Sequence, residues 1–269
     1  MALEDSLFSV SGLEVALPDM AAKPVFGRAP LIQILKGINL EITRGSVLGI
    51  VGGSGSGKST LGRALLRLLE PTGGTIRFDG QDITHLNEDA LRPIRRRMQM
   101  IFQDPMSSLN PRRRVGAIIA DPLLMHEFDA IDARVDDALD HVGLPRGFKS
   151  RYPHELSGGQ RQRVGIARAI ALKPEFILAD EIVSGLDVSS QAQVLNVLDN
   201  LVKELGLTLA FISHDLSVIR RLCDRVMVLN RGEIAEFANT DRLFAAPQSA
   251  YTRELMDAIP LPDPNQANW

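Results

Sequence analysis

Cysteine and aromatic residues are scarce in this sequence. Its 269 residues include one cysteine, Cys223, and Phe, Trp and Tyr together make up 5% of the chain. A single cysteine excludes a disulfide framework within the chain and fits a reducing compartment. So few aromatic side chains provide no interleaved set for stacking bases, and the clusters Arg95–Arg97 and Arg112–Arg114 are therefore better explained as solvated or protein-contacting faces than as a nucleic-acid surface.

A strong net charge and long hydrophobic runs are also missing. The formal net charge is −3, so the field of the whole chain favours neither nucleic acid nor an anionic membrane surface. No apolar run approaches the ~18 residues that a membrane-spanning helix needs, so we expect membrane contact only through a partner. With 45% hydrophobic residues, the chain can bury one large core, or a core with an additional lobe.

A glycine-rich segment with the pattern G-x-x-x-x-G-K-[ST] is the strongest signal in the sequence. It follows Ser46–Val51, an apolar stretch that predicts a short buried strand, and it precedes Thr60–Leu69, whose pattern predicts a helix. This order of strand, loop and helix is typical of a phosphate-binding loop. The loop residues are Gly52, Gly53, Ser54, Gly55, Ser56, Gly57, Lys58, Ser59 and Thr60.

The residue types of this phosphate loop suit a nucleoside triphosphate. Glycines let consecutive backbone N–H groups curl around an anion, and the start of a helix adds partial positive charge. Lys58 can reach the β- and γ-phosphates, and the Ser59 hydroxyl can bind Mg²⁺. A chance Gly/Ser turn would not place this lysine and serine in register between both flanking elements, so the segment predicts binding of a nucleoside triphosphate.

A second motif begins at Leu156, at the head of a segment that predicts a helix as far as Ile170. Its functional residues are Ser157, Gly158, Gly159 and Gln160. Ser157 is a natural N-cap, and the pattern alone is also explained by a capped helix. In a chain with a phosphate loop, it adds a second anion-binding helix start. One ATP does not easily need both from one chain, so the motifs favour two chains that each close the other's nucleotide.

These motifs resemble the ATP-binding subunits of ABC transporters, from roughly Phe8 to Asp257. The remaining family motifs follow in the expected order: the Q-loop glutamine Gln103, the Walker B strand Phe176–Asp180 with Glu181 after it, the D-loop Ser184–Asp187 and the switch histidine His214. Each short motif is weak by itself, whereas the ordered set is specific. The resemblance implies ATP and Mg²⁺ as cofactors.

Three of these residues carry the expected chemistry. Asp180 ends an apolar strand, where its carboxylate can hold Mg²⁺ directly or through water, and Glu181 can activate the attacking water as a general base. His214 follows a β-rich run and would contact the γ-phosphate. A solvated turn and a structural histidine are the ordinary explanations, and the phosphate loop favours the functional ones. The family further implies that Gln103 senses the metal and the water, and that Asp187 links two sites across a dimer.

The resemblance also implies the fold and its domains. We expect an α/β fold, a P-loop ABC-type ATPase core with a parallel central sheet, an N-terminal antiparallel β part and a helical lobe. The ATPase domain would cover residues 7–257, with the lobe at about 104–171 and a tail at 258–269. The patterns predict strands at Leu7–Val15 and Ile38–Ile42, a loop from Pro18 to Pro30, and a hairpin turn at Asn230–Gly232.

Three segments resemble the branch of the family that imports di- and oligopeptides or nickel: Gln103–Arg112, Arg151–Glu155 and Ala250–Leu255. The branch implies four features. They are a second ATPase subunit, identical or homologous; transmembrane permease subunits that dock on Ser107–His126; a solute-binding protein as an indirect partner; and a peripheral location on the cytoplasmic face of the cell membrane. Nucleic acid is not an expected partner.

One position departs from the family pattern. Ile182 stands after Glu181 where proline is usual, which leaves the rigidity of that loop open. Many members stack an early aromatic residue on adenine, and Phe26 is the candidate here.

Two other classes of protein remain as alternatives. A soluble ABC-type ATPase acting on DNA would need a long coiled-coil insertion between Thr60 and Leu156, and that segment has neither the length nor the heptads. A ribosome-acting one usually carries two ATPase units in one chain. A non-hydrolytic regulatory subunit is disfavoured by the intact Glu181, His214 and signature motif.

Overall fold

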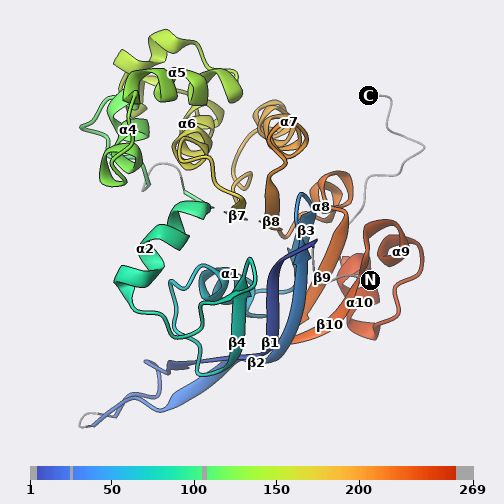
Figure 1. Cartoon of the computed structure of the whole chain (residues 1–269). Helices are drawn as coiled ribbons and strands as arrows, with labels where there is room; N and C mark the ends of the chain where they lie inside the picture. The colour runs from blue at the N-terminus through green and yellow to red at the C-terminus, as the bar shows by residue number, and fades with distance from the viewer. Residues whose placement is uncertain (1–4, 25–26, 105–107, 259–269) are drawn as a thin grey trace. The chain divides into compact units, whose positions relative to one another are not determined.

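The computed structural model describes residues 5–24, 27–104 and 108–258, and its chain forms two compact units (Figure 1). Residues 1–91 and 211–269 form the first unit, and residues 92–210 form the second. Two elements span the points where the chain passes between the units. They are α2 (Glu88–Arg97) and β8 (Thr208–Ile212).

An antiparallel sheet with the strand order β2-β1-β4-β5 forms one part of the first unit. Its strands are β1 (Ser6–Pro18), β2 (Leu31–Thr43), β4 (Gly73–Phe78) and β5 (Gln81–Asp82). The predicted antiparallel β part is therefore present, but β1 and β2 extend beyond the predicted strands. The pairing continues to Pro18↔Leu31, where exposed side chains give no alternating pattern that sequence reasoning could detect.

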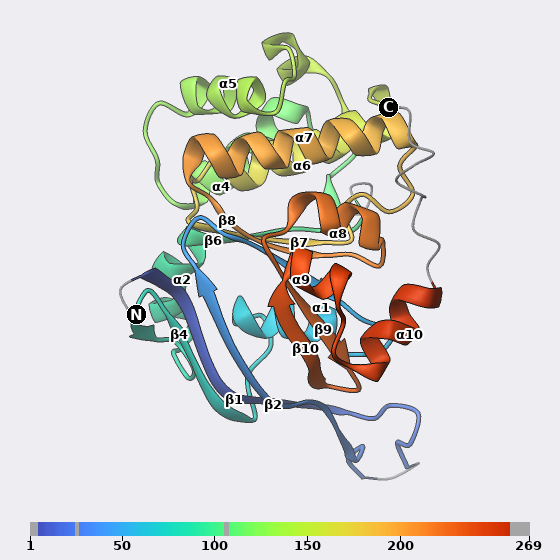
Figure 2. The same cartoon turned by 90° about the vertical axis from the view of Figure 1, so that its right-hand side faces the viewer.

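The rest of the first unit contains a parallel strand pair. β3 (Val47–Val51) pairs in parallel with β9 (Arg225–Asn230), which pairs antiparallel with β10 (Glu233–Asn239). Positive φ angles at Arg231 and Gly232 make the tight turn of this hairpin, which confirms the predicted turn. The helices are α1 (Lys58–Leu65), α8 (Leu216–Leu222), α9 (Thr240–Ala245) and α10 (Ala250–Ala258), and both α9 and α10 lie beside β10 (Figure 2).

Helices dominate the second unit. β6 (Met98–Ile101) and β7 (Phe176–Asp180) pair in parallel. Three helices follow β6 and precede β7 in the sequence, and they pack on one another: α4 (Val115–Met125), α5 (Ile131–His141) and α6 (Gly158–Ile170). After β7, α7 (Val188–Leu205) packs on α6 (Figure 1). Two short 3₁₀ turns, η2 (Arg146–Ser150) and η3 (Pro153–Glu155), precede α6.

The apolar strands form the core of the fold. Every residue of β3, β7 and β8 is buried, as expected for parallel strands that are covered on both faces. The continuous apolar runs therefore predict β3 and β7 almost to the residue. The chain has a mixed α/β fold with an antiparallel sheet and a parallel-rich sheet, as predicted.

Candidate functional site

The glycine-rich loop lies between β3 and α1, as predicted. β3 ends at Val51, and α1 begins at Lys58 with Gly57 as its N-cap residue. Glycine offers no capping side chain, so the start of α1 suits an anion. Gly52 has a φ of 151°, and a Cβ there would lie 2.2 Å from the carbonyl oxygen of Leu229. The backbone at position 52 therefore requires glycine.

Lys58 turns back over the loop. Its Nζ donates hydrogen bonds to the carbonyl oxygens of Gly52, at 2.8 Å, and Gly53, at 2.9 Å. The Ser56 hydroxyl is buried and has no hydrogen-bond partner among the described residues. A buried ammonium group and an unpaired buried hydroxyl in one glycine loop are groups that phosphate oxygens can satisfy, so these residues fit the phosphates of ATP.

Distant segments of the same unit hold the loop in place. The Gly232 N–H, in the β9–β10 turn, donates to the Ser56 carbonyl oxygen at 3.0 Å, and the Gly53 N–H donates to Tyr251 Oη at 2.9 Å. Sequence reasoning placed Tyr251 only in a motif of the family branch. Its contact with the loop joins residues 198 positions apart, and no local pattern could have indicated it.

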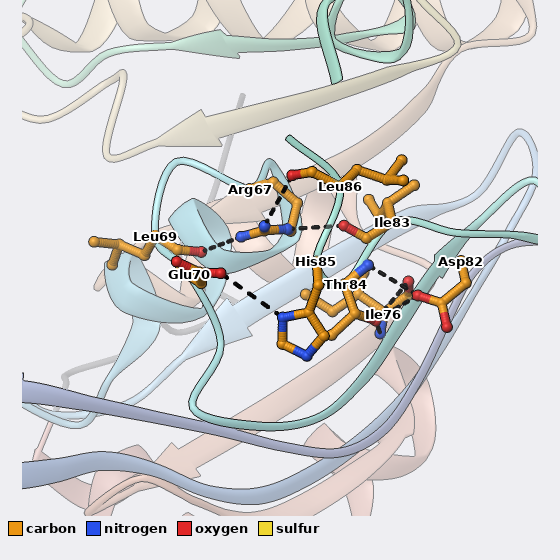
Figure 3. Close-up of polar contacts among 9 residues, drawn as sticks. All are labelled: Arg67, Leu69, Glu70, Ile76, Asp82, Ile83, Thr84, His85 and Leu86. Atoms are coloured by element: carbon orange, nitrogen blue, oxygen red, sulfur yellow. Dashed lines mark hydrogen bonds and ion pairs between the residues drawn. The ribbon is translucent and has the colours of Figure 1, made fainter. Parts of the chain in front are cut away.

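The helix after the loop ends earlier than predicted. The pattern indicated a helix over Thr60–Leu69, but α1 stops at Leu65 and Arg67 has a positive φ of 53°. The buried Arg67 donates to the carbonyl oxygens of Ile83, at 2.8 Å, and Leu86, at 3.5 Å (Figure 3). These contacts fix a turn after α1, so tertiary structure overrides the local helical preference.

His214 lies in the first unit, in the segment between β8 and α8. The neighbouring Ser213 N–H donates to the carbonyl oxygen of Ile50 at 3.4 Å, so this segment runs beside β3, the strand that leads into the glycine loop. Asp215 caps α8 by accepting a hydrogen bond from the Ser217 N–H at 2.9 Å. The backbone on both sides of the exposed His214 is therefore fixed.

The second unit brings Gln103 and Glu181 together. Gln103 Nε2 donates to Glu181 Oε2 at 3.1 Å. Ile101 of β6 lies opposite Ala179 of β7 in the parallel register, so both strands end at the same edge of the sheet. The sequence assigned these two residues to separate motifs, and the parallel pairing explains why their side chains meet.

Asp180 and the loop after it are held firmly. Asp180 is the buried last residue of β7. Glu181 has a positive φ of 51°, and its carbonyl oxygen accepts a hydrogen bond from the Ser184 hydroxyl at 2.8 Å. Ile182, where the family usually has proline, is 1% exposed. A buried side chain fixes this loop in place of a proline ring.

The donor set fits Mg²⁺. No group of three or more His, Cys, Asp or Glu residues gathers in the described part of the chain. Mg²⁺ is bound by one or two carboxylates together with waters and phosphate oxygens, so a dense cluster is not needed. Ser59, Gln103 and Asp180 all offer oxygen donors.

The signature motif forms the start of α6. Ser157 caps this helix, as predicted: its hydroxyl accepts from the Gln160 N–H at 3.3 Å, and the Gln160 side chain accepts from the Ser157 N–H at 3.0 Å. A Cβ on Gly159 would lie 2.9 Å from the Cβ of Ser190 in α7. Gly159 therefore lets α6 approach the first turn of α7.

Asp187 caps α7. Its carboxylate accepts hydrogen bonds from the Ser190 hydroxyl, at 2.7 Å, and the Ser190 N–H, at 2.9 Å. These bonds hold the pKa of Asp187 below its ordinary value. The D-loop and the signature motif thus meet at Ser190. Two predicted positions, the adenine candidate Phe26 and Ser107 of the docking segment, lie outside the described residues.

Comparison with known families decides the identity. A family model described as ABC transporter matches residues 35–184. The chain belongs to the ABC transporter family. Within this family it is an ABC-type ATPase, and the predicted resemblance to the ATP-binding subunits of ABC transporters is confirmed. No helix in the part of this ABC protein that the structure describes is long and apolar enough to cross a membrane.

Relatives and solved structures agree with this assignment. A protein of Brucella ovis, named for peptide import and ATP binding, is 51% identical over 97% of this ABC protein and 81% of its own length. The structure of cbiO1 from Clostridium perfringens, part of the ABC transporter complex cbiONQ, matches with 30% identity and a TM-score of 0.78 over 96% of this chain and 97% of that one. A dimeric structure of the ATP-binding cassette MJ0796, bound to ADP and Pi, matches with 30% identity and a TM-score of 0.75, covering 87% and 98%.

The loop geometry predicts unequal effects of two alanine substitutions. Gly55, at a φ of 73°, has open space around a built Cβ, whereas Gly52 does not. We expect Gly55→Ala to lower the free energy of unfolding by about 1–2 kcal/mol, the cost of a left-handed L-residue. Gly52→Ala should cost more, because its Cβ overlaps the Leu229 carbonyl oxygen. Urea unfolding followed by circular dichroism measures both, and equal losses would contradict this account of the loop.

Proposed function

We propose that this ABC protein is the ATP-hydrolysing subunit of an importer that takes up di- or oligopeptides. The observation that carries the hydrolysis is the 3.1 Å contact between Gln103 and Glu181, directly after the buried Asp180. Support for peptides comes from the identity of 51% with the Brucella ovis protein and from the three branch motifs. An importer of nickel or another small solute is the second candidate within the same branch.

The first unit carries the residues that would hold the phosphates of ATP. The N–H groups of the glycine loop would hold the phosphates together with the Lys58 ammonium, which the Gly52 and Gly53 carbonyl oxygens position at the loop. Ser59, Gln103 and Asp180 would hold Mg²⁺. When bound, Mg²⁺ supplies charge neutralisation on the phosphates.

Hydrolysis would depend on the carboxylate of Glu181. As a general base it would take a proton from the attacking water, and the amide of Gln103 would orient the carboxylate and the water together. His214 would position the γ-phosphate from the segment beside β3. The backbone is fixed around Glu181 in one unit and, separately, around His214 in the other. Such local preorganisation of side chains is a main source of catalysis in phosphoryl transfer.

A second ATPase subunit, identical or homologous, would complete the site. The dimeric structure of MJ0796 supports such an assembly. In this arrangement Ser157, Gly158, Gly159 and Gln160 would close the partner's nucleotide, and Asp187 would link the two sites. The shared contact of both motifs with Ser190 would make them move as one body.

Permease subunits are the proposed membrane partners. The place of cbiO1 in a transporter complex supports a permease contact. Within the proposed docking segment, Leu124 is 59% exposed and Met125 is 64% exposed, as a protein-binding face would require. The chain would then lie at the cytoplasmic face of the membrane, with a solute-binding protein as an indirect partner. Its ATPase domain would cover residues 7–257, with a helical lobe at about 104–171.

Replacing Glu181 tests the general base. Glu181→Gln keeps the size of the side chain and an oxygen that can accept from Gln103, but it removes the proton acceptor. We expect the variant to bind ATP and to lose its turnover. Phosphate release measures turnover, and ATP titration measures binding. Comparable ATPase rates in the variant and the wild type would sink the assignment of Glu181.

Replacing Lys58 tests the phosphate site. We expect Lys58→Ala to remove ATP binding in an equilibrium titration, because the only cation that lies over the Gly52 and Gly53 carbonyl oxygens in the described structure is lost. Lys203→Ala is the matched control, since Lys203 is exposed and pairs with Asp199 on the surface of α7. Retained ATP affinity in Lys58→Ala would refute the role of Lys58.

A further inference from the structure

Tyr251 lies at the start of α10, far from the glycine loop in sequence but beside it in the first unit. Its phenol oxygen accepts a hydrogen bond from the Gly53 N–H at 2.9 Å. Tyr251 itself is half-buried, and none of the ATPase roles described above uses it. Its motif, Ala250–Leu255, therefore makes a contact with the nucleotide site that the proposed function does not explain.

The contact acts on one particular peptide group. The Gly53 N–H and the Gly52 carbonyl belong to the same peptide plane, and in a trans peptide they point in opposite directions. Tyr251 Oη accepts from the N–H, and Lys58 Nζ donates to the carbonyl oxygen at 2.8 Å. The plane is therefore held from both sides, by a phenol and by the phosphate-binding lysine.

This peptide needs such a restraint. It joins two glycines, which have no Cβ to limit rotation, so the peptide plane can turn at little steric cost. A turned plane would remove the Gly52 carbonyl oxygen from Lys58 and displace its ammonium. The two hydrogen bonds thus keep the loop in the orientation that presents Lys58.

The phenol is presented by a well-anchored segment. The carboxylate of Glu236, in β10, accepts from the backbone N–H groups of Gln248 and Ser249, both at 3.0 Å, directly before α10. Arg253 donates back to the carbonyl oxygen of Pro247 at 3.0 Å. Burial of Glu236 opposes its ionisation, but these backbone hydrogen bonds, together with the Thr252 hydroxyl and the charge of Arg242, favour the carboxylate, and the pKa of Glu236 is lowered. The start of α10 is therefore fixed to β10, and this fixed backbone positions the Tyr251 side chain.

We infer that Tyr251 is a positioning residue of the phosphate loop, and that its hydroxyl fixes the Gly52–Gly53 peptide so that Lys58 is held ready for the phosphates of ATP. The inference rests on the proposed function, in which this loop binds ATP. The opposite role, a phenol that competes with phosphate for the Gly53 N–H, makes the opposite prediction.

Removal of the hydroxyl alone separates these roles. In the Glu181→Gln background, which keeps ATP intact, we expect Tyr251→Phe to raise the Kd for ATP about three- to tenfold, the range of one lost hydrogen bond. The melting temperature should change little. Tyr152→Phe is the matched control, because it removes the other tyrosine hydroxyl of the chain, and its Kd should equal that of the parent. An unchanged or lower Kd in Tyr251→Phe would overturn the inference.

A second substitution tests whether Tyr251 acts through the Gly53 peptide. A Cβ on Gly53 would lie 3.1 Å from Tyr251 Oη, and no other atom of the described residues, apart from its two chain neighbours, would lie within 4 Å of it. Alanine at this position therefore crowds only the hydroxyl. Gly53→Ala should weaken ATP binding when Tyr251 is present. In Tyr251→Phe the hydroxyl is absent, so Gly53→Ala should not weaken ATP binding any further. The added Cβ should instead restrict rotation of the peptide between residues 52 and 53.

The expected result is therefore a double variant that binds ATP at least as tightly as Tyr251→Phe alone. Independent, additive losses would contradict a shared action on the peptide and would leave Tyr251 as an anchor of α10 only. If the Glu181→Gln parent itself failed to bind ATP, the proposed function would fall, and the inference with it.

Discussion

The backbone conformation of the glycine-rich loop is the constraint on which the rest of this structure depends. Gly52 occupies a position where any side chain would overlap the Leu229 carbonyl oxygen, and Lys58 is held by the carbonyl oxygens of Gly52 and Gly53. The loop cannot keep this shape alone. The β9–β10 turn contacts it through Gly232, and α10 contacts it through Tyr251. Two distant segments of the first unit thus support one glycine-rich turn.

The second unit positions the carboxylate of Glu181. Parallel pairing of β6 and β7 brings the ends of both strands to one edge, and Gln103 and Glu181 meet there. The close approach of α6 and α7, which Gly159 permits, ties the signature motif to the D-loop at Ser190. The packing of strands and helices in the second unit therefore fixes the position of Gln103 relative to Glu181 and that of the signature motif relative to the D-loop.

Local patterns predicted most of this arrangement, and long-range contacts account for the rest. The apolar runs of β3 and β7 and the turn at Asn230–Gly232 are encoded in a few adjacent residues. The early end of α1 depends on Arg67 reaching Ile83, and the support of the loop depends on Tyr251, which no neighbouring residue indicates. The loop pattern predicts Lys58 and Ser59, and the family motifs indicate Gln103, but the Gln103–Glu181 contact follows from strand register, which a sequence pattern does not fix.

The central claim is that this ATPase works on a membrane transporter. Its most direct test is to recover the tagged Glu181→Gln chain from membranes, with and without ATP, and to identify the co-purified proteins by mass spectrometry. The account predicts polytopic permease subunits, and any homologous ATPase recovered with them would define the second subunit. Recovery of ribosomes or DNA-bound proteins without a permease would leave the ATP chemistry intact and contradict the role in transport.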